Sequence, residues 1–166
     1  MNIAVQVEPS VGTPPAVEFR WDTDTDILTA RVAAPVEGTG PSGSLEVEGT
    51  DGAWLILDVV KGHIVGLEVA VWPDVHKRAT LAAPSVVEDA RVVLPAGAPH
   101  AGPVLLEINT PLLAESDTEE RVIYFRLGLK REVRTVRLGR DLLLDLDVQG
   151  RLAGLWLLNV PPFPST

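Results

Sequence analysis

Two carboxylates lie two positions apart in the run LLLDLDVQGRLAGLWLLNV, where Asp145 and Asp147 precede Gly150. Paired carboxylates can supply oxygen ligands to Ca²⁺ or Mg²⁺. In a tight turn, Asp side chains instead accept backbone N–H bonds and Gly takes the positive φ. The earlier run LILDVVKGHIVGLEVAVW repeats the arrangement but has Val60 in place of the second Asp. This difference favours the turn role, and we predict neither a metal site nor a cofactor.

A second acidic motif, DTDTD at residues 22–26, is similar to the start of a calcium-binding loop. An EF-hand loop requires Gly at its sixth position and Glu at its twelfth. Those positions hold Ile27 and Ala33, so the calcium motif is not met. We interpret DTDTD as a turn whose charges also discourage pairing at a sheet edge.

The three histidines, His63, His76 and His100, form no metal-binding pattern. Asp74 and His76 could supply two ligands, whereas a structural zinc site needs four and a catalytic one needs three plus water. The sequence also lacks a Gly-x-Ser-x-Gly nucleophile motif, and its segment GTGPSG lacks the Lys-Ser/Thr ending of a phosphate loop. These features favour a protein that is not an enzyme.

The charge and composition narrow the classes of partner. A formal net charge of −9 argues against nucleic-acid binding, which requires a basic surface. It suits a basic protein partner, or an acidic surface that keeps a β-rich protein soluble. No apolar run reaches the roughly 20 residues that span a bilayer, and the start of the chain lacks the pattern of a signal peptide. With no cysteines, we expect an acidic cytoplasmic protein that binds neither membrane nor nucleic acid.

Strands must position these residues, because clustered Val favours β-structure and 14 Gly with 14 Pro imply many turns. One pattern occurs twice: ILTARV aligns with VIYFRL, SLEVEG with TVRLG, and LILDVVKGHIVGLEV with LLLDLDVQGRLAGLWL. We predict a single all-β domain over residues 1–160. It would comprise two repeats, 17–73 and 115–160, an irregular segment 74–114 between them, and a tail, 161–166.

A sheet of three or four strands needs a second layer to bury its apolar face. We therefore expect the two repeats to pack about a pseudo-twofold axis, as a sandwich or a closed barrel. The residues that recur in the two long hairpins are expected to be structural turn residues: Asp58, Gly62, Gly66, Asp145, Asp147, Gly150 and Gly154.

Both repeats resemble the domain of unknown function 2283, a family of short bacterial proteins. In the second repeat the resemblance covers residues 116–159 and rests on Asp117, VIYFRL, Asp145, Asp147, Gly150 and Gly154. In the first it covers residues 19–72 and rests on Asp24, Asp26, ILTARV, Asp58, Gly62, Gly66, Leu67 and Glu68. The first copy departs at Val60, and the second has Trp156 in place of Glu68. The family has no established activity, and the resemblance implies an antitoxin or immunity-type role.

Strands that are apolar on both faces imply two covered faces or an oligomer interface. We predict a homodimer formed through the hairpins, with Trp54, Trp72 and Trp156 as candidate interface residues. The favoured function is a non-enzymatic β-domain that acts through protein–protein contact. The alternative is a small-ligand or metal-dependent enzyme, in which Asp58 and Asp145, with His63 as a further candidate, meet at a pocket between the repeats. The two functions differ in whether these carboxylates converge.

Overall fold

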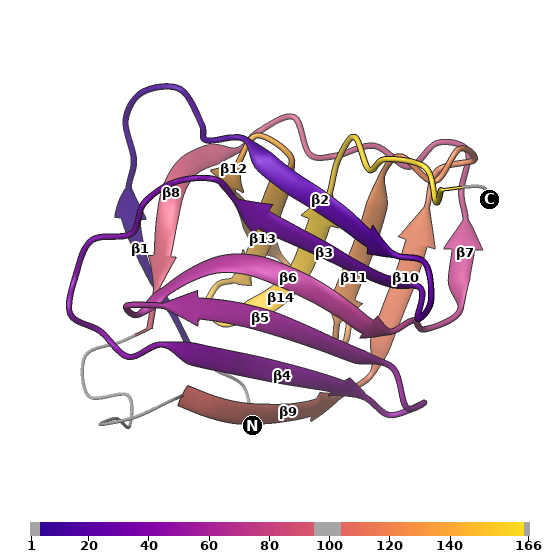
Figure 1. Ribbon diagram of the computed structural model, residues 1–166, viewed down its shortest axis with the longest axis horizontal. Coiled ribbons are helices and arrows are strands. Elements are labelled where there is room, and N and C mark those ends of the chain that lie inside the picture. The colour runs from indigo at the N-terminus through magenta and orange to yellow at the C-terminus, as the bar shows by residue number, and fades with distance from the viewer. Residues whose placement is uncertain (1–3, 95–103, 165–166) are drawn as a thin grey trace.

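The computed structural model describes residues 4–94 and 104–164, except for the side chains of residues 104–108. All of its regular elements are β-strands, so the predicted all-β class is confirmed (Figure 1). In chain order the strands are β1 (Gln6–Pro9), β2 (Val17–Asp22), β3 (Ile27–Val32), β4 (Gly43–Gly49), β5 (Trp54–Val60), β6 (His63–Val71), β7 (Val75–Lys77), β8 (Glu88–Val93), β9 (Val104–Thr110), β10 (Leu112–Ser116), β11 (Ile123–Leu127), β12 (Val133–Gly139), β13 (Leu142–Asp147) and β14 (Leu152–Leu157).

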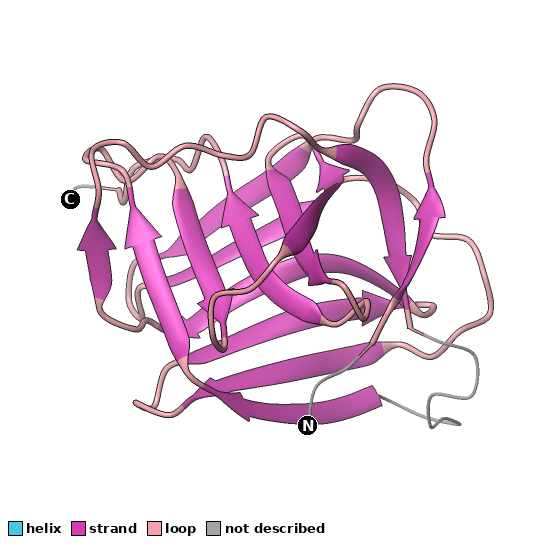
Figure 2. Cartoon of the chain, turned by 180° about the vertical axis from the view of Figure 1, so that it is seen from behind, coloured by secondary structure: helices cyan, strands magenta, loops and turns pink. Residues whose placement is uncertain are grey.

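The strands form two layers. The first layer has the order β2-β3-β6-β5-β4-β9, and its only parallel pair among these strands is β4 with β9. The second layer has the order β7-β10-β11-β14-β13-β12-β8, in which β7 and β8 pair in parallel with their neighbours. The strands of the first layer run across those of the second in both views (Figures 1 and 2).

The two layers are continuous parts of one curled sheet. Strand β8 pairs with β12 over two residues and with β6 through His63 and Val93, and β1 pairs with β8 as well. At the other end, β9 of the first layer is followed after Pro111 by β10 of the second. The sheet therefore curls into an open half-barrel around the space between its layers.

An aliphatic core fills the space between the layers. Strand β5 shows the period of two expected of a half-buried strand, with Leu55, Leu57 and Val59 buried and the residues between them more exposed. The same inward positions on β13 hold Leu142 and Leu144, which are fully buried. Every residue of β13 and β14 is buried, so the outer face of the second layer is also covered there.

The segment between the predicted repeats contains more regular structure than its sequence indicates. Residues 74–114 include β7, β8, β9 and the start of β10, and these strands extend both layers. Residues 96–103 of the predicted irregular segment, which include His100, lie outside the described residues. In the predicted tail, the Pro161 carbonyl accepts a hydrogen bond from Trp21 Nε1, and Phe163 packs edge-on against the Trp21 ring.

Candidate functional site

The hairpins β5–β6 and β13–β14 contain the same pair of residues. Asp58 lies opposite Gly66, Asp145 lies opposite Gly154, and the strand register shifts directly after each Asp. A Cβ atom on Gly66 would lie 2.8 Å from a backbone carbonyl oxygen of β3. On Gly154 it would lie 3.0 Å from the equivalent oxygen of β11. Both positions require glycine because the neighbouring backbone approaches closely.

The side chains of Asp58 and Asp145 point away from the core, to opposite sides of the molecule. The residues flanking Asp58 and Asp145 along their strands belong to the core cluster, so the aspartates lie on the outer faces of the two layers. The structure places both in mid-strand, before the hairpin turns. It does not bring them to a common pocket, as the enzymatic alternative would require.

Asp147 and two of the glycines do lie in turns. Asp147 Oδ1 accepts hydrogen bonds from the backbone N–H groups of Gln149 and Arg151, each at 2.9 Å. Gly62 has φ 82° and Gly150 has φ 75°, values that favour glycine. Burial raises the pKa of Asp147, but the two N–H groups and the guanidinium groups of Arg151 and Arg131 outweigh it and hold the pKa below its usual value.

Asp145 has a polar and aromatic environment on the outer face of the second layer. It is only 3% exposed, and its oxygens accept hydrogen bonds from Thr135 Oγ1 at 2.7 Å and Trp156 Nε1 at 3.2 Å. Trp156 in turn stacks on Tyr124, with ring centroids 4.3 Å apart. Burial raises the pKa of Asp145, although both hydrogen bonds oppose the shift. Burial, followed by the nearby Asp145, raises the pKa of Tyr124 to about 12.

Asp145, Trp156 and Tyr124 line a cleft of about 370 Å³, a volume within the range of small-molecule sites. One wall is formed by residues 78–84, which lead from β7 toward β8. The connection between β11 and β12 adds further lining residues. Its basic lining residues are Arg78, Arg126, Lys130 and Arg131, and its acidic ones are Glu115 and Asp145.

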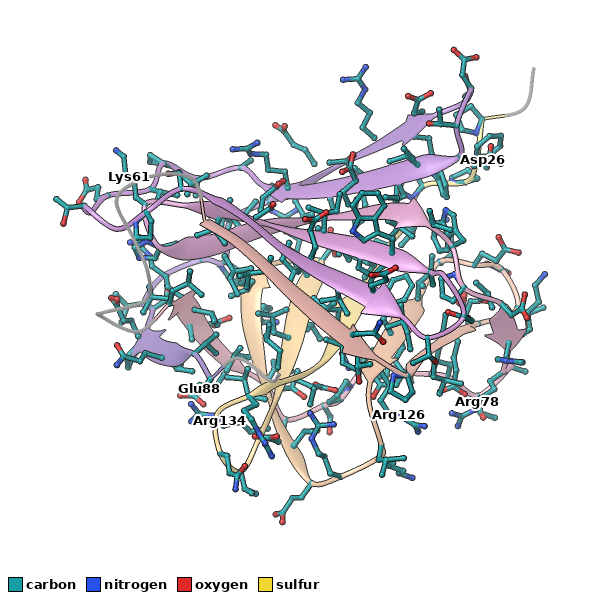
Figure 3. The ribbon with its side chains drawn as sticks, turned by 90° about the horizontal axis from the view of Figure 1, so that it is seen from below. Asp26, Lys61, Arg78, Glu88, Arg126 and Arg134 are labelled. Atoms are coloured by element: carbon teal, nitrogen blue, oxygen red, sulfur yellow. The ribbon has the colours of Figure 1, made fainter. Side chains whose placement is uncertain are left out.

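The four basic side chains differ in the hydrogen bonds and ion pairs that they already form within the protein. Arg78 forms an ion pair of 2.8 Å with Glu115. Arg131 donates to Asp147 and to three backbone carbonyls, which fixes it as a structural bridge. Toward the residues that the structure describes, Arg126 donates only through Nε, to the Gly128 carbonyl. Within the described part of the chain, neither Arg126 nor Lys130 forms an ion pair. Arg78 and Arg126 lie on the same side of the molecule, away from the turn at Asp26 (Figure 3).

The equivalent positions on the first layer keep one arginine but carry no aromatic pair. The two layers can be aligned through their Asp–Gly pairs. In this alignment Arg31 corresponds to Arg126, Glu68 to Trp156 and Thr29 to Tyr124. Residues 17–73, the first predicted repeat, contain ten acidic and three basic residues, whereas 115–160 contains eight of each. The negative charge of the chain is therefore concentrated in the first layer, and the basic cleft is specific to the second.

The predicted interface tryptophans lie in three separate places. Trp54 lies on the outer face of the first layer and is 37% exposed. Trp72 packs between Trp21 and Phe125 and donates from Nε1 to the Asp26 carbonyl. Trp156 lines the basic cleft. These residues do not form one surface, and the homodimer stays a prediction.

The remaining candidates do not add a second chemical site. His63 Nδ1 lies 3.1 Å from the Lys61 carbonyl, and His76 is exposed on the short edge strand β7. Residues 4–94 and 104–164 contain no cluster of three His, Cys, Asp or Glu side chains able to hold a metal ion. No helix among these residues has the length and apolar character needed to cross a membrane.

Sequence reasoning had missed the cleft, although two of its signals are visible in the chain. Tyr124 and Arg126 alternate with apolar residues in YFRL, and Lys130 and Arg131 follow directly in the next connection. Such alternation places both polar side chains on one face of a strand. Comparison of the chain with models of protein families gives no match, and no curated protein matches it either.

Proposed function

We propose that the protein is a non-enzymatic binding domain that acts through contact with another protein, and that the basic cleft is its contact site. The observation that carries this proposal is the set of free donors around the Tyr124–Trp156 pair. Arg126 and Lys130 lie there without ion-pair partners within the described residues. Aromatic and Arg side chains in partly buried pockets are the residues that contribute most to binding energy at protein interfaces.

The proposal includes an internal duplication of the scaffold about a pseudo-twofold axis. Its support is the strand order, since β2-β3-β6-β5-β4-β9 parallels β10-β11-β14-β13-β12-β8, each ending in a parallel pair. The turn glycines agree with this as well. The Gly62 carbonyl accepts the N–H of Leu94, and the Gly150 carbonyl accepts the N–H of Val5. A duplicated scaffold assigns function to the positions where the copies differ, and the cleft is the largest such difference.

A selection of displayed random peptides on the immobilised protein tests the contact site. Peptides that bind the cleft should lose affinity by about tenfold or more for Arg126→Glu, because the variant replaces a charge-assisted donor with a repelling charge. Arg31→Glu is the matched control, since it makes the same change at the equivalent position of the first layer. The proposal fails if selected peptides bind both variants equally, or if none requires the cleft.

A further inference from the structure

We infer that the cleft is selective for an acidic peptide segment, with one carboxylate of the segment paired to Arg126. This inference rests on the proposed function and adds the chemistry of the partner. Among the described residues, Arg126 donates only its Nε–H, to the Gly128 carbonyl, so its two terminal nitrogens are available there. A guanidinium with free terminal N–H groups binds a carboxylate through two parallel hydrogen bonds.

The acidic side chains of the cleft do not compete with such a ligand for Arg126. Glu115 is already paired with Arg78 at 2.8 Å. The Asp145 oxygens accept from Thr135 and Trp156, and the side chain is buried. The positive charge of Arg126 and Lys130 is therefore left for a ligand. Negative charges of the ligand would meet attraction in the cleft and repulsion from the acidic first layer, so charge also directs the ligand to the second layer.

The rest of the lining suits a peptide better than a nucleic acid. Leu81, Ala82 and Pro84 give one wall an apolar character, and the Tyr124–Trp156 stack adds aromatic area beside Arg126. Nucleic acid instead requires a continuous basic surface that contacts several phosphates. The chain has a net charge of −9, and its free basic side chains at the cleft are few. An acidic segment needs only one or two cationic contacts with apolar contacts around them.

The test uses two end-blocked peptides, one of six glutamates and one of six glutamines, titrated into the full chain by calorimetry. We expect the glutamate peptide to bind and the glutamine peptide to bind at least about tenfold more weakly, since charge-assisted bonds are the stronger ones. Added salt should weaken binding because the contact is solvent-accessible. Arg126→Gln should reduce affinity by about tenfold. Arg126→Lys should restore part of it, and Arg31→Gln should leave it unchanged.

Four outcomes would overturn the inference; the first two leave the proposed protein contact intact, and the last two overturn it as well. Equal binding of the two peptides, or undiminished glutamate binding by a folded Arg126→Gln variant, would show that carboxylates are not selected. Free glutarate that binds as tightly as the peptide would make the ligand a small acid. A short single-stranded RNA that displaces the peptide and binds more tightly would replace the peptide by nucleic acid. Circular dichroism of each variant verifies its fold, and Arg126→Lys keeps the test decisive if Arg126→Gln unfolds.

Discussion

The outer faces of the two layers share an Asp–Gly pair across neighbouring strands but differ in the side chains that surround it. Asp58 on the first layer is partly exposed and lies opposite Ser44 and Gly66. Asp145 on the second layer is 3% exposed and accepts hydrogen bonds from Thr135 and Trp156. The Asp–Gly pair is thus a scaffold feature in both layers. The neighbouring strands decide whether the carboxyl group faces solvent or forms the base of a lined cleft.

The difference arises from a few positions and from one added segment. Glu68 and Thr29 form a polar row on the first layer, where the second layer has an aromatic row of Trp156 and Tyr124. Residues 78–84 then wall the cleft on the second layer. Burying a carboxyl group is unfavourable unless donors satisfy it, and the hydroxyl of Thr135 and the indole of Trp156 serve that purpose. The aromatic row therefore both lines the cleft and satisfies its buried carboxyl group.

Substitutions in the turns of the two hairpins are expected to differ most in their effect on the free energy of unfolding. Asp147 has a side chain that is 2% exposed and accepts from two backbone N–H groups and from Arg131 and Arg151. Asp147→Ala should lower the free energy of unfolding by about 2–4 kcal/mol, because it leaves these donors unpaired; the partial exposure of both arginines reduces the loss expected for a fully buried pair. Urea unfolding measures the loss.

The first hairpin supplies the control, since Val60→Ala removes no hydrogen bond and should cost about 1 kcal/mol or less. Lowering the pH gives a second way to distinguish the role of Asp147 from that of Val60. The pKa of Asp147 is lowered in the folded state, so its stabilisation is present above the ordinary pKa and is lost as pH falls through the folded pKa. Wild type should lose stability over that range more steeply than Asp147→Ala. Equal costs for both substitutions at neutral pH would contradict the contrast between the turns.

The glycines opposite the aspartates should respond alike in the two layers. A Cβ on Gly66 or Gly154 meets a backbone oxygen of the adjacent strand at 2.8 or 3.0 Å. Gly66→Ala and Gly154→Ala should therefore each cost about 1–3 kcal/mol, because the strands must separate slightly. Thermal or urea unfolding of the two variants measures this. If one of the two variants is as stable as the wild type, the Asp–Gly pair does not have the same structural role in both layers.

The sequence predicts these shared features because they are local. Turn glycines and alternation of side chains depend on a few consecutive residues, and they gave the all-β class and the two hairpins. The parallel pairs β4–β9 and β12–β8 were not predicted, since such pairing joins distant segments without a local pattern. The mid-strand position of Asp145 was missed for a related reason: the register shift that follows it depends on the partner strand.

Replacing Asp145 and Asp58 by Leu in two separate variants compares the two outer faces of the sheet directly. Asp145→Leu leaves Trp156 Nε1 and the Thr135 hydroxyl without their acceptor in a buried site, which should cost about 1–3 kcal/mol. Asp58→Leu changes a partly exposed residue and should cost about 0.5 kcal/mol or less. Urea unfolding and the near-ultraviolet signal of Trp156 measure the two changes. Similar losses at both positions would show that Asp145 is not held by its two donors.

The smallest expected effect is the pH dependence contributed by Asp145. Burial raises its pKa above the usual 3.8 in the folded protein, against the two hydrogen bonds. The folded state therefore binds this proton more tightly than the unfolded state, and its contribution to stability falls as pH rises from the ordinary pKa through the folded one. Asp145→Asn cannot titrate, so its stability relative to wild type should rise over that window and level off above it. Thr135→Val removes a bond that favours the charged form and should extend the window to higher pH. A stability difference between Asp145→Asn and wild type that is independent of pH would contradict the raised pKa.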